Sequence, residues 1–188
     1  MKKILWIDAC VRKESRTRKL AEHILSKLGG TVTRVDLDKE QIPPLTGKML
    51  TYRSRKAEEQ DFSDPVFRYA VQFKDADEIL ISAPYWDLSF PAILKIFIEN
   101  IYVTGLVTKF GENGRPVGLC KAKKLYYVAT SGGKFIPDFS YNYIESLCKG
   151  CFGIKETELI FAQMLDVDGF DAEKIMADAI NEINAKYE

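Results

Sequence analysis

The first segment whose residues could bind a ligand or take part in a reaction is ACVRKESRT (9–17), which lies between an apolar run and a helix-like stretch. Ser15 and Thr17 suit the start of that helix, where free backbone N–H groups and the helix dipole attract an anion. Positive charge is added by Arg12 and Arg16 in the segment and by Arg18 directly after it. These features predict a phosphate site, although a capped helix with solvated arginines gives the same pattern. The segment lacks G-x-G-x-x-G, which disfavours tight binding of a dinucleotide.

The second segment, PYWDLSF (84–90), places two aromatic residues and an acid where a small turn would connect a strand to a helix. Proline suits the first turn of a helix, so Pro91 marks a helix start and leaves a rigid ledge before it. The ledge consists of Pro84, Tyr85, Trp86, Asp87 and Leu88. Aromatic faces and N–H groups on such a ledge suit a flat heteroaromatic ligand. The alternative is that Tyr85 and Trp86 only cover the sheet edge.

The third segment, TSGGKF (130–135), places two glycines at the end of another apolar run. Glycine allows a tight turn and a close approach of the backbone to a ligand, although an ordinary strand–helix turn explains the pattern almost as well. The segment predicts a wall formed by Thr130, Ser131, Gly132 and Gly133. A phosphate grip, an aromatic platform and a glycine wall together predict a site for flavin mononucleotide (FMN).

The rest of the sequence alternates strand-like and helix-like stretches. Strands are expected at 3–7, 31–37, 78–83, 123–131 and 157–163. Helices are expected at 17–28, 61–77, 91–102, 141–152 and 171–187. Such alternation predicts an α/β fold, namely one flavodoxin-like, doubly wound domain over 1–188 whose five-stranded parallel sheet has the order 2-1-3-4-5 and helices on both faces. The segment 38–60 is expected to be a long loop over the site.

This fold explains why the three segments belong to one site. They follow the first, third and fourth predicted strands, and ligands of open α/β sheets bind at the carboxyl ends of the strands. The 27 basic and 27 acidic residues balance, which gives no general attraction to nucleic acid or to an anionic membrane. No apolar run approaches the roughly 20 residues that span a bilayer, so a cytoplasmic protein is expected. The four cysteines are expected to be thiols, and no metal site is expected.

The motifs PYWDLSFPAILK and TSGG resemble those of the flavin-dependent NAD(P)H:quinone reductases. The segments ESRTRKL, GLVTKFGENG (105–114) and KGCFGI (149–154) are closer to the FMN-dependent NADH-azoreductases, which share that fold and mechanism. The resemblance covers about 1–165. It implies an FMN-dependent homodimer with sites at the interface, and FMN is preferred over FAD. The implied reaction is ping-pong: NAD(P)H reduces the flavin, leaves, and is replaced by a quinone, azo compound or nitroaromatic that accepts two electrons.

The resemblance also implies roles for individual residues. The phosphate grip corresponds to Ser15, Arg16 and Thr17, with Cys10 beside it, and the ledge 84–88 follows the flavin edge largely through backbone groups. Aromatic residues of the substrate pocket correspond to Phe110 and Phe152. A catalytic tyrosine has no clear match, and only Tyr141 or Tyr143 offers a substitute. Azoreductases usually carry asparagine where Asp87 stands, and a carboxylate beside the flavin would disfavour its anionic reduced form.

Two alternative functions fit parts of the sequence. Cys10 and Arg16 form a C-x5-R spacing that resembles the loop of low-molecular-weight tyrosine phosphatases and arsenate reductases, in which a thiolate attacks and an arginine holds the oxyanion. Against this reading, the loop has no glycine, and Glu14 would repel an anion. The second alternative is a flavodoxin-like binding protein without flavin, and Asp87 is the residue that favours it.

Overall fold

The structure is a computed structural model that describes residues 1–135 and 138–187. Its centre is a five-stranded parallel sheet with the order β2-β1-β3-β6-β7, which confirms the predicted doubly wound order. The strands are β1 (Lys3–Asp8), β2 (Thr31–Asp36), β3 (Glu78–Ser82), β6 (Lys124–Thr130) and β7 (Glu156–Ala162). The three central strands are apolar and almost wholly buried, as expected for strands covered on both faces.

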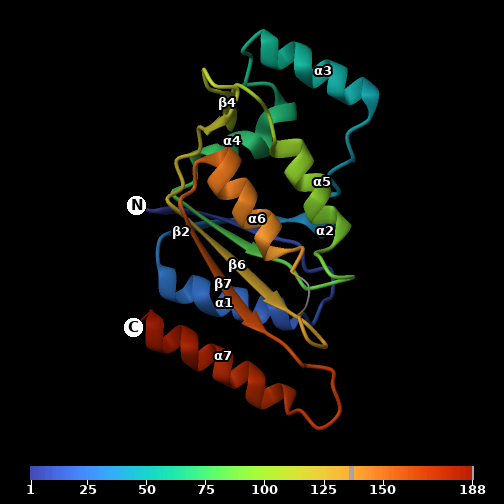
Figure 1. Cartoon of the computed structure of the whole chain (residues 1–188), viewed down its shortest axis with the longest axis vertical. Helices are drawn as coiled ribbons and strands as arrows, with labels where there is room; N and C mark the ends of the chain where they lie inside the picture. The colour runs from blue at the N-terminus through green and yellow to red at the C-terminus, as the bar shows by residue number, and fades with distance from the viewer. Residues whose placement is uncertain (136–137, 188) are drawn as a thin grey trace.

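Helices cover both faces of this sheet (Figure 1). One face carries α1 (Arg16–Leu28) and α7 (Ala172–Lys186). The other face carries α4 (Arg68–Asp75), α5 (Ala92–Ile101) and α6 (Tyr141–Leu147), and a π-helical turn, Cys148–Phe152, continues α6. The apolar stripes of these helices and the two faces of the sheet form two cores, one on each side. No helix of the described chain is both long and apolar enough to cross a bilayer.

The segment 38–60 contains helices, so the prediction of a long loop there was wrong. It holds most of the short α2 (Leu37–Glu40) and the longer α3 (Gly47–Glu58). Thr46 caps α3 by accepting a hydrogen bond from the N–H of Met49. Arg53 of α3 donates to the carbonyl of Glu99 at 2.8 Å, which ties α3 to the end of α5 rather than to the predicted site.

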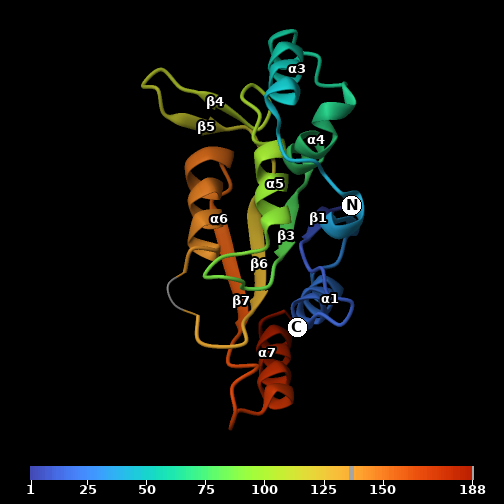
Figure 2. The same ribbon diagram turned by 90° about the vertical axis from the view of Figure 1, so that its right-hand side faces the viewer.

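A second departure is a β-hairpin in the connection between α5 and β6. Its strands are β4 (Thr108–Phe110) and β5 (Pro116–Gly118), which pair antiparallel. Figure 2 shows the hairpin projecting from one side of the molecule, beyond the ends of α5 and α6. Gly118 passes so close to the backbone of Phe152 that a Cβ atom there would lie 2.0 Å from its carbonyl carbon. The base of the hairpin is therefore packed against the π-helical turn, while its tip is free.

Candidate active site

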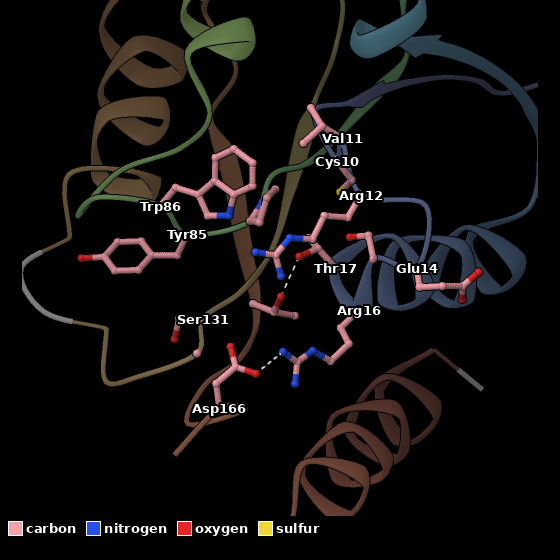
Figure 3. A pocket seen from close by; sticks show the side chains of 14 residues that line it. Cys10, Val11, Arg12, Glu14, Arg16, Thr17, Tyr85, Trp86, Ser131 and Asp166 are labelled. Atoms are coloured by element: carbon pink, nitrogen blue, oxygen red, sulfur yellow. Dashed lines mark hydrogen bonds and ion pairs between the residues drawn. The ribbon is translucent and has the colours of Figure 1, made fainter. Parts of the chain in front are cut away.

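A pocket of about 230 Å³ lies at the carboxyl ends of the central strands. Its lining comes from the loops after β1, β3 and β6, as the sequence predicts, and from the loop after β7 (Figure 3). The lining residues are Cys10, Val11, Arg12, Glu14, Ser15, Arg16, Thr17, Pro84, Tyr85, Trp86, Thr130, Ser131, Gly132 and Asp166. The pocket lies where β1 meets β3 and the chain changes its winding direction, the usual ligand position in this architecture.

The start of α1 supplies hydrogen-bond donors to this pocket. Ser15 is the N-cap, and its Oγ accepts from the N–H of Arg18 at 3.2 Å. The N–H groups of Arg16 and Thr17 have no partner within the helix, because they belong to its first turn. The Thr17 hydroxyl is buried and hydrogen-bonded to that of Thr130 at 2.7 Å, which joins α1 to the end of β6. The predicted helix start is therefore correctly placed at the pocket.

The three arginines of the first loop have three different surroundings. Arg16 donates to the carbonyl of Leu165 at 2.8 Å and forms an ion pair with Asp166, so its charge is already compensated. Arg18 is paired with the buried carboxylate of Asp8. The side chain of Arg12 forms no ion pair in the described chain and extends between the aromatic ledge and the start of α1 (Figure 3). Arg12, which was left out of the predicted phosphate grip, is thus the uncompensated cation at the pocket.

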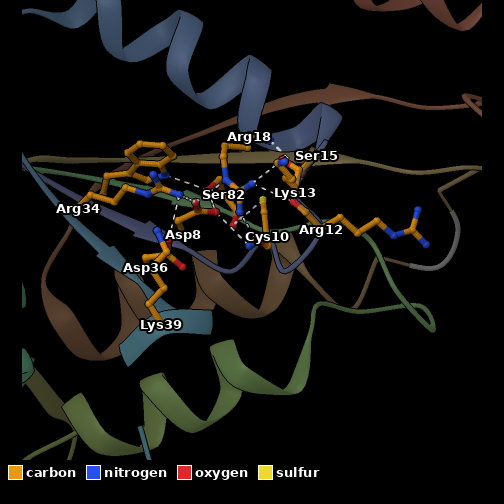
Figure 4. Close-up of polar contacts among 11 residues, drawn as sticks. Asp8, Cys10, Arg12, Lys13, Ser15, Arg18, Arg34, Asp36, Lys39 and Ser82 are labelled. Atoms are coloured by element: carbon orange, nitrogen blue, oxygen red, sulfur yellow. Dashed lines mark hydrogen bonds and ion pairs between the residues drawn. The ribbon is translucent and has the colours of Figure 1, made fainter. Parts of the chain in front are cut away.

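Asp8 is the centre of a buried polar cluster behind the first loop (Figure 4). Its carboxylate is fully buried and receives Arg18 Nε at 2.8 Å and Arg34 Nη2 at 2.5 Å. It also accepts from Ser82 Oγ and from the N–H of Cys10, both at 3.0 Å. Burial alone would raise the Asp8 pKa, but the hydrogen bonds from Arg18 and Cys10 outweigh it and hold the pKa below its usual value.

Cys10 is a buried thiol and not an activated nucleophile. Its Sγ donates to the carbonyl of Ser82 at 3.6 Å. Burial and the nearby Asp8 carboxylate raise its pKa to about 12. Arg16, the second half of the C-x5-R spacing, is paired with Asp166. Because a phosphatase of this type requires a thiolate and a free arginine, the geometry argues against that alternative.

The ledge presents aromatic rings to the pocket, while part of its backbone is already hydrogen-bonded. The Tyr85 N–H donates to Thr130 O at 2.9 Å, and the Trp86 N–H donates to Ser89 O at 3.0 Å. The expectation that the ledge acts largely through its backbone therefore fails for these two groups. Between Trp86 and Ser89, Asp87 and Leu88 form a tight turn with φ angles of 50° and 67°. Both side chains are exposed, and neither belongs to the pocket lining.

The wall opposite the ledge is formed by two loops that are hydrogen-bonded along their backbones. The N–H groups of Leu165 and Asp166 donate to Ser131 O and Gly132 O at 3.2 and 2.9 Å. A Cβ atom at Gly132 would lie 2.5 Å from Oδ2 of Asp166, so a larger residue here would displace the carboxylate that pairs with Arg16. Gly133 accepts from the N–H of Met164 but lies outside the pocket lining.

The remaining predicted site residues lie away from this pocket in the chain. Phe152 is a core residue whose ring packs edge-to-face on Phe73, so it lines no pocket at the strand ends. Phe110 lies in the hairpin with 70% of its surface exposed. Tyr141 is hydrogen-bonded to Thr157 Oγ1 at 2.9 Å, and Tyr143 packs against Phe90. None of these four residues lines the pocket of its own chain.

Sequence reasoning missed the loop after β7. Asp166 follows the fifth predicted strand at the same edge of the sheet as the other three loops, and that position alone would have included it. Within the described residues, no group of three or more histidine, cysteine, aspartate or glutamate side chains is arranged to hold a metal ion. All four cysteines are free, as expected.

Comparison with known proteins agrees with this arrangement. Residues 2–187 match a protein family described as having a flavodoxin-like fold. A curated relative from Coprothermobacter proteolyticus, named FMN-dependent NADH:quinone oxidoreductase, is 35% identical over 97% of this chain and 96% of its own length. A relative of the same name from Clostridium beijerinckii is 36% identical over 96% of each chain.

Solved structures resemble the chain over nearly its whole length. The crystal structure of an azoreductase from Bacillus anthracis superposes with a TM-score of 0.84 at 26% identity and covers 100% of this chain and 99% of its own. An FMN-dependent NADH-azoreductase from the same species, solved in complex with FMN, gives a TM-score of 0.83 at 23% identity, covering 100% and 98%. At that identity, the second likeness concerns the fold alone.

Proposed function

The chain belongs to the family with the flavodoxin-like fold, and from this premise we propose that it is an FMN-dependent NAD(P)H oxidoreductase that transfers two electrons to quinones or azo compounds. The named activities of its relatives and of the Bacillus anthracis azoreductase support this assignment. The observation that carries it is the pocket itself, in which a donor-rich helix start, aromatic rings and a glycine wall face one another. Nitroaromatic acceptors are part of the same proposal.

The donors of the first loop fit the phosphate of FMN. In the described chain, the N–H groups of Val11, Lys13 and Glu14 form no hydrogen bond, and those of Arg16 and Thr17 are unpaired in the first turn of α1. Such clustered donors at the positive end of a helix dipole bind a phosphate dianion favourably. We assign the phosphate to those of these groups that line the pocket, namely the N–H groups of Val11, Glu14, Arg16 and Thr17, with the Arg12 guanidinium as the cation that compensates its charge.

The ring system of the cofactor is assigned to the space between the ledge and the glycine wall. Trp86 and Tyr85 line one side, and Ser131 and Gly132 line the other, while the ring of Tyr85 packs edge-to-face on Phe135. Bound FMN supplies the capacity to accept a hydride from NAD(P)H and to pass two electrons to an acceptor. The residues that line the pocket would hold and orient the cofactor. This assignment needs no dinucleotide fingerprint, because NAD(P)H binds only transiently.

Asp87 does not argue against a flavin. Its side chain is exposed on the turn and lies outside the pocket lining, so it places no carboxylate against the proposed ring position. The left-handed backbone at this position favours asparagine or aspartate, which explains why either residue suits the turn. The flavin-less alternative therefore loses the feature that favoured it.

A homodimer is the second part of the proposal. The hairpin tip exposes Phe110 and Val117, with 70% and 42% of their surfaces accessible, on an arm that projects from the molecule. Exposed apolar side chains on a projecting element are typical of an interaction surface. Phe110 is proposed to reach the pocket of the second subunit, since it does not reach its own.

We also place the enzyme in the cytoplasm, where NADH is produced, and fractionation of the source cells would test this placement.

The test of the function is a titration followed by steady-state kinetics. Addition of apo-protein to FMN is expected to quench the flavin fluorescence, with one FMN bound per protein chain at saturation. The loaded protein is expected to oxidise about one equivalent of NADH per flavin without an acceptor and to turn over continuously when a quinone such as menadione is present, with the parallel double-reciprocal lines of a ping-pong reaction. No change in flavin fluorescence during the titration would refute the proposal. Hydrolysis of an aryl phosphate by that protein would instead support the phosphatase alternative.

A further inference from the structure

The conformation of the first loop is held by one side chain. Arg18 Nη1 donates to the carbonyls of Arg12 at 2.8 Å and Lys13 at 3.1 Å, and Nη2 donates to the carbonyl of Cys10. Its Nε donates to Asp8 Oδ2 at 2.8 Å. A single guanidinium thus binds three carbonyl groups of a four-residue stretch and links them to one buried carboxylate (Figure 4).

These contacts determine where the N–H groups of the loop point. In a trans peptide the carbonyl and the N–H of the next residue lie on opposite sides of the chain. The carbonyls of Cys10, Arg12 and Lys13 face Arg18, so the N–H groups of Val11, Lys13 and Glu14 face away from it. They form no hydrogen bond in the described chain, and neither do the N–H groups of Arg12 and Ser15 in the same loop. The loop acquires an anion-binding concavity without glycine, through a side chain that holds its carbonyls from behind.

Asp8, which holds Arg18, is itself fixed in place because each of its two carboxylate oxygens accepts two hydrogen bonds. Ser82 Oγ donates to Asp8 Oδ1, and Trp6 Nε1 in turn donates to Ser82 Oγ at 2.8 Å. Arg34 approaches the same carboxylate from β2 and lies over the ring of Trp6 at 4.5 Å. Asp8 stays ionised below neutral pH, so the anchor keeps its charge under working conditions.

We propose that Arg18, held by Asp8, is a positioning residue that shapes the first loop into a phosphate-binding conformation and so makes the protein prefer a phosphorylated flavin over an unphosphorylated one. The inference rests on the proposed flavin function. Arg18 does not line the pocket, so it acts through the loop carbonyls and not by contact with the phosphate. A lysine at this position would keep the charge but could not hold three carbonyls and a carboxylate with one planar group.

The test compares FMN with riboflavin, which lacks the phosphate, in the full-length protein. Dissociation constants for both ligands are measured by fluorescence quenching for the wild type, Arg18→Lys and Arg18→Met. Both variants are expected to weaken FMN binding by about tenfold or more, since charge-assisted hydrogen bonds to the loop are lost. Riboflavin binding is expected to stay within about twofold. The control is Lys27→Met, which removes an exposed cation at the far end of the same helix, outside the pocket lining, and is expected to leave both constants unchanged.

Three results would overturn the inference. Wild-type affinity for FMN in Arg18→Lys would show that only charge matters at this position. An equal loss of FMN and riboflavin affinity would indicate a general collapse of the pocket. A wild-type protein that binds both flavins equally would show that no phosphate site exists, whereas one that binds neither would refute the proposed function itself.

A crystal structure of the wild-type protein grown with FMN provides a test that does not depend on a variant that folds. Arg18 is expected to remain on the carbonyls of Cys10, Arg12 and Lys13, while loop N–H groups contact the phosphate. A structure in which the Arg18 guanidinium leaves the loop and contacts the phosphate directly would contradict the positioning role.

Discussion

At the scale of single residues, the first loop shows that like side chains in one segment serve different purposes. Arg12, Arg16 and Arg18 occur within seven positions, and their sequence pattern is the same: a cation near a helix start. The structure separates them by their partners, because Asp166 compensates Arg16 and Asp8 compensates Arg18. Only Arg12 keeps an unpaired charge toward the pocket in the described chain.

Arg12→Ala tests this distribution of charge. The substitution is expected to weaken FMN binding by about fivefold to tenfold at low salt, because it removes a cation that faces the phosphate, and riboflavin binding is expected to be unchanged. The loss is expected to shrink as salt is added, since the side chain is exposed. Isothermal titration at two salt concentrations measures both effects.

The control for that experiment is Lys13→Ala, which removes the adjacent exposed cation but not a residue of the pocket lining. Lys13 uses its carbonyl, not its side chain, to bind Arg18, so this substitution preserves the loop. If the two variants lose the same FMN affinity, the effect is a general one of positive charge and Arg12 has no special position.

Sequence reasoning at the residue scale identified positions but not partners. Ser15, Thr17, Trp86 and Gly132 line the pocket as predicted. The assignment of Arg16 to an open phosphate grip failed to anticipate Asp166, which is 150 positions away in the chain. A pairing over that separation depends on the tertiary arrangement of the sheet, which the local pattern around Arg16 does not contain.

At the scale of elements, the turn between Trp86 and Ser89 explains the shape of the ledge. The two residues exchange backbone hydrogen bonds at 3.0 and 2.8 Å, and the two residues between them both have positive φ. This is the geometry of a two-residue turn in which both central positions favour Asn-Gly. Leu88 occupies the second of these positions with 45% of its surface exposed.

Leu88→Gly is expected to stabilise the protein by about 1 kcal/mol, because glycine carries no penalty in the left-handed region. The measurement is thermal or urea denaturation of the apo-protein. Leu88→Ala serves as the control, since it removes the same exposed side chain but keeps a Cβ atom and the penalty. Equal stability of the two variants would show that the turn is not strained at this position.

The predictability of the elements follows the strength of their apolar pattern. The strands and the helices over 17–28, 91–102, 141–152 and 171–187 carry a clear period, and the structure places them close to those limits. The one side chain of α3 that is buried is Arg53, which is bound at the end of α5, so this helix lacks the buried apolar side chains of the other long helices. The β4–β5 hairpin has only three residues in each strand, too few for a periodic signal.

At the scale of the whole molecule, the free hairpin tip and the pocket lie in different parts of the structure. The pocket is at the carboxyl ends of the strands, whereas the hairpin projects beyond the opposite ends of α5 and α6 (Figure 2). A single chain therefore cannot bring Phe110 to its own pocket without unfolding the hairpin. The proposed dimer gives this exposed ring a function.

Phe110→Ser tests the proposed dimer. Sedimentation equilibrium is expected to give twice the mass of one chain for the wild type. The dimer dissociation constant of the variant is expected to be about tenfold higher than that of the wild type, or more, because burial of a phenylalanine contributes about 1.5 to 3 kcal/mol. Phe170→Ser, which removes another exposed ring near α7, is expected to leave the mass unchanged. A wild-type protein with the mass of one chain at every concentration would exclude the dimer.

The contact between Gly132 and Asp166 has a consequence for turnover. At this point the backbones of two loops are joined by hydrogen bonds, Gly132 has no Cβ atom, and the side chain that lies over it is the Asp166 carboxylate, which is paired with Arg16. Main chain of this kind has no rotamers to change when one occupant departs and another arrives. A reductant and an acceptor of different shape, bound one after the other, would each contact this same backbone surface. Discrimination between the two substrates would then depend on the aromatic side of the pocket.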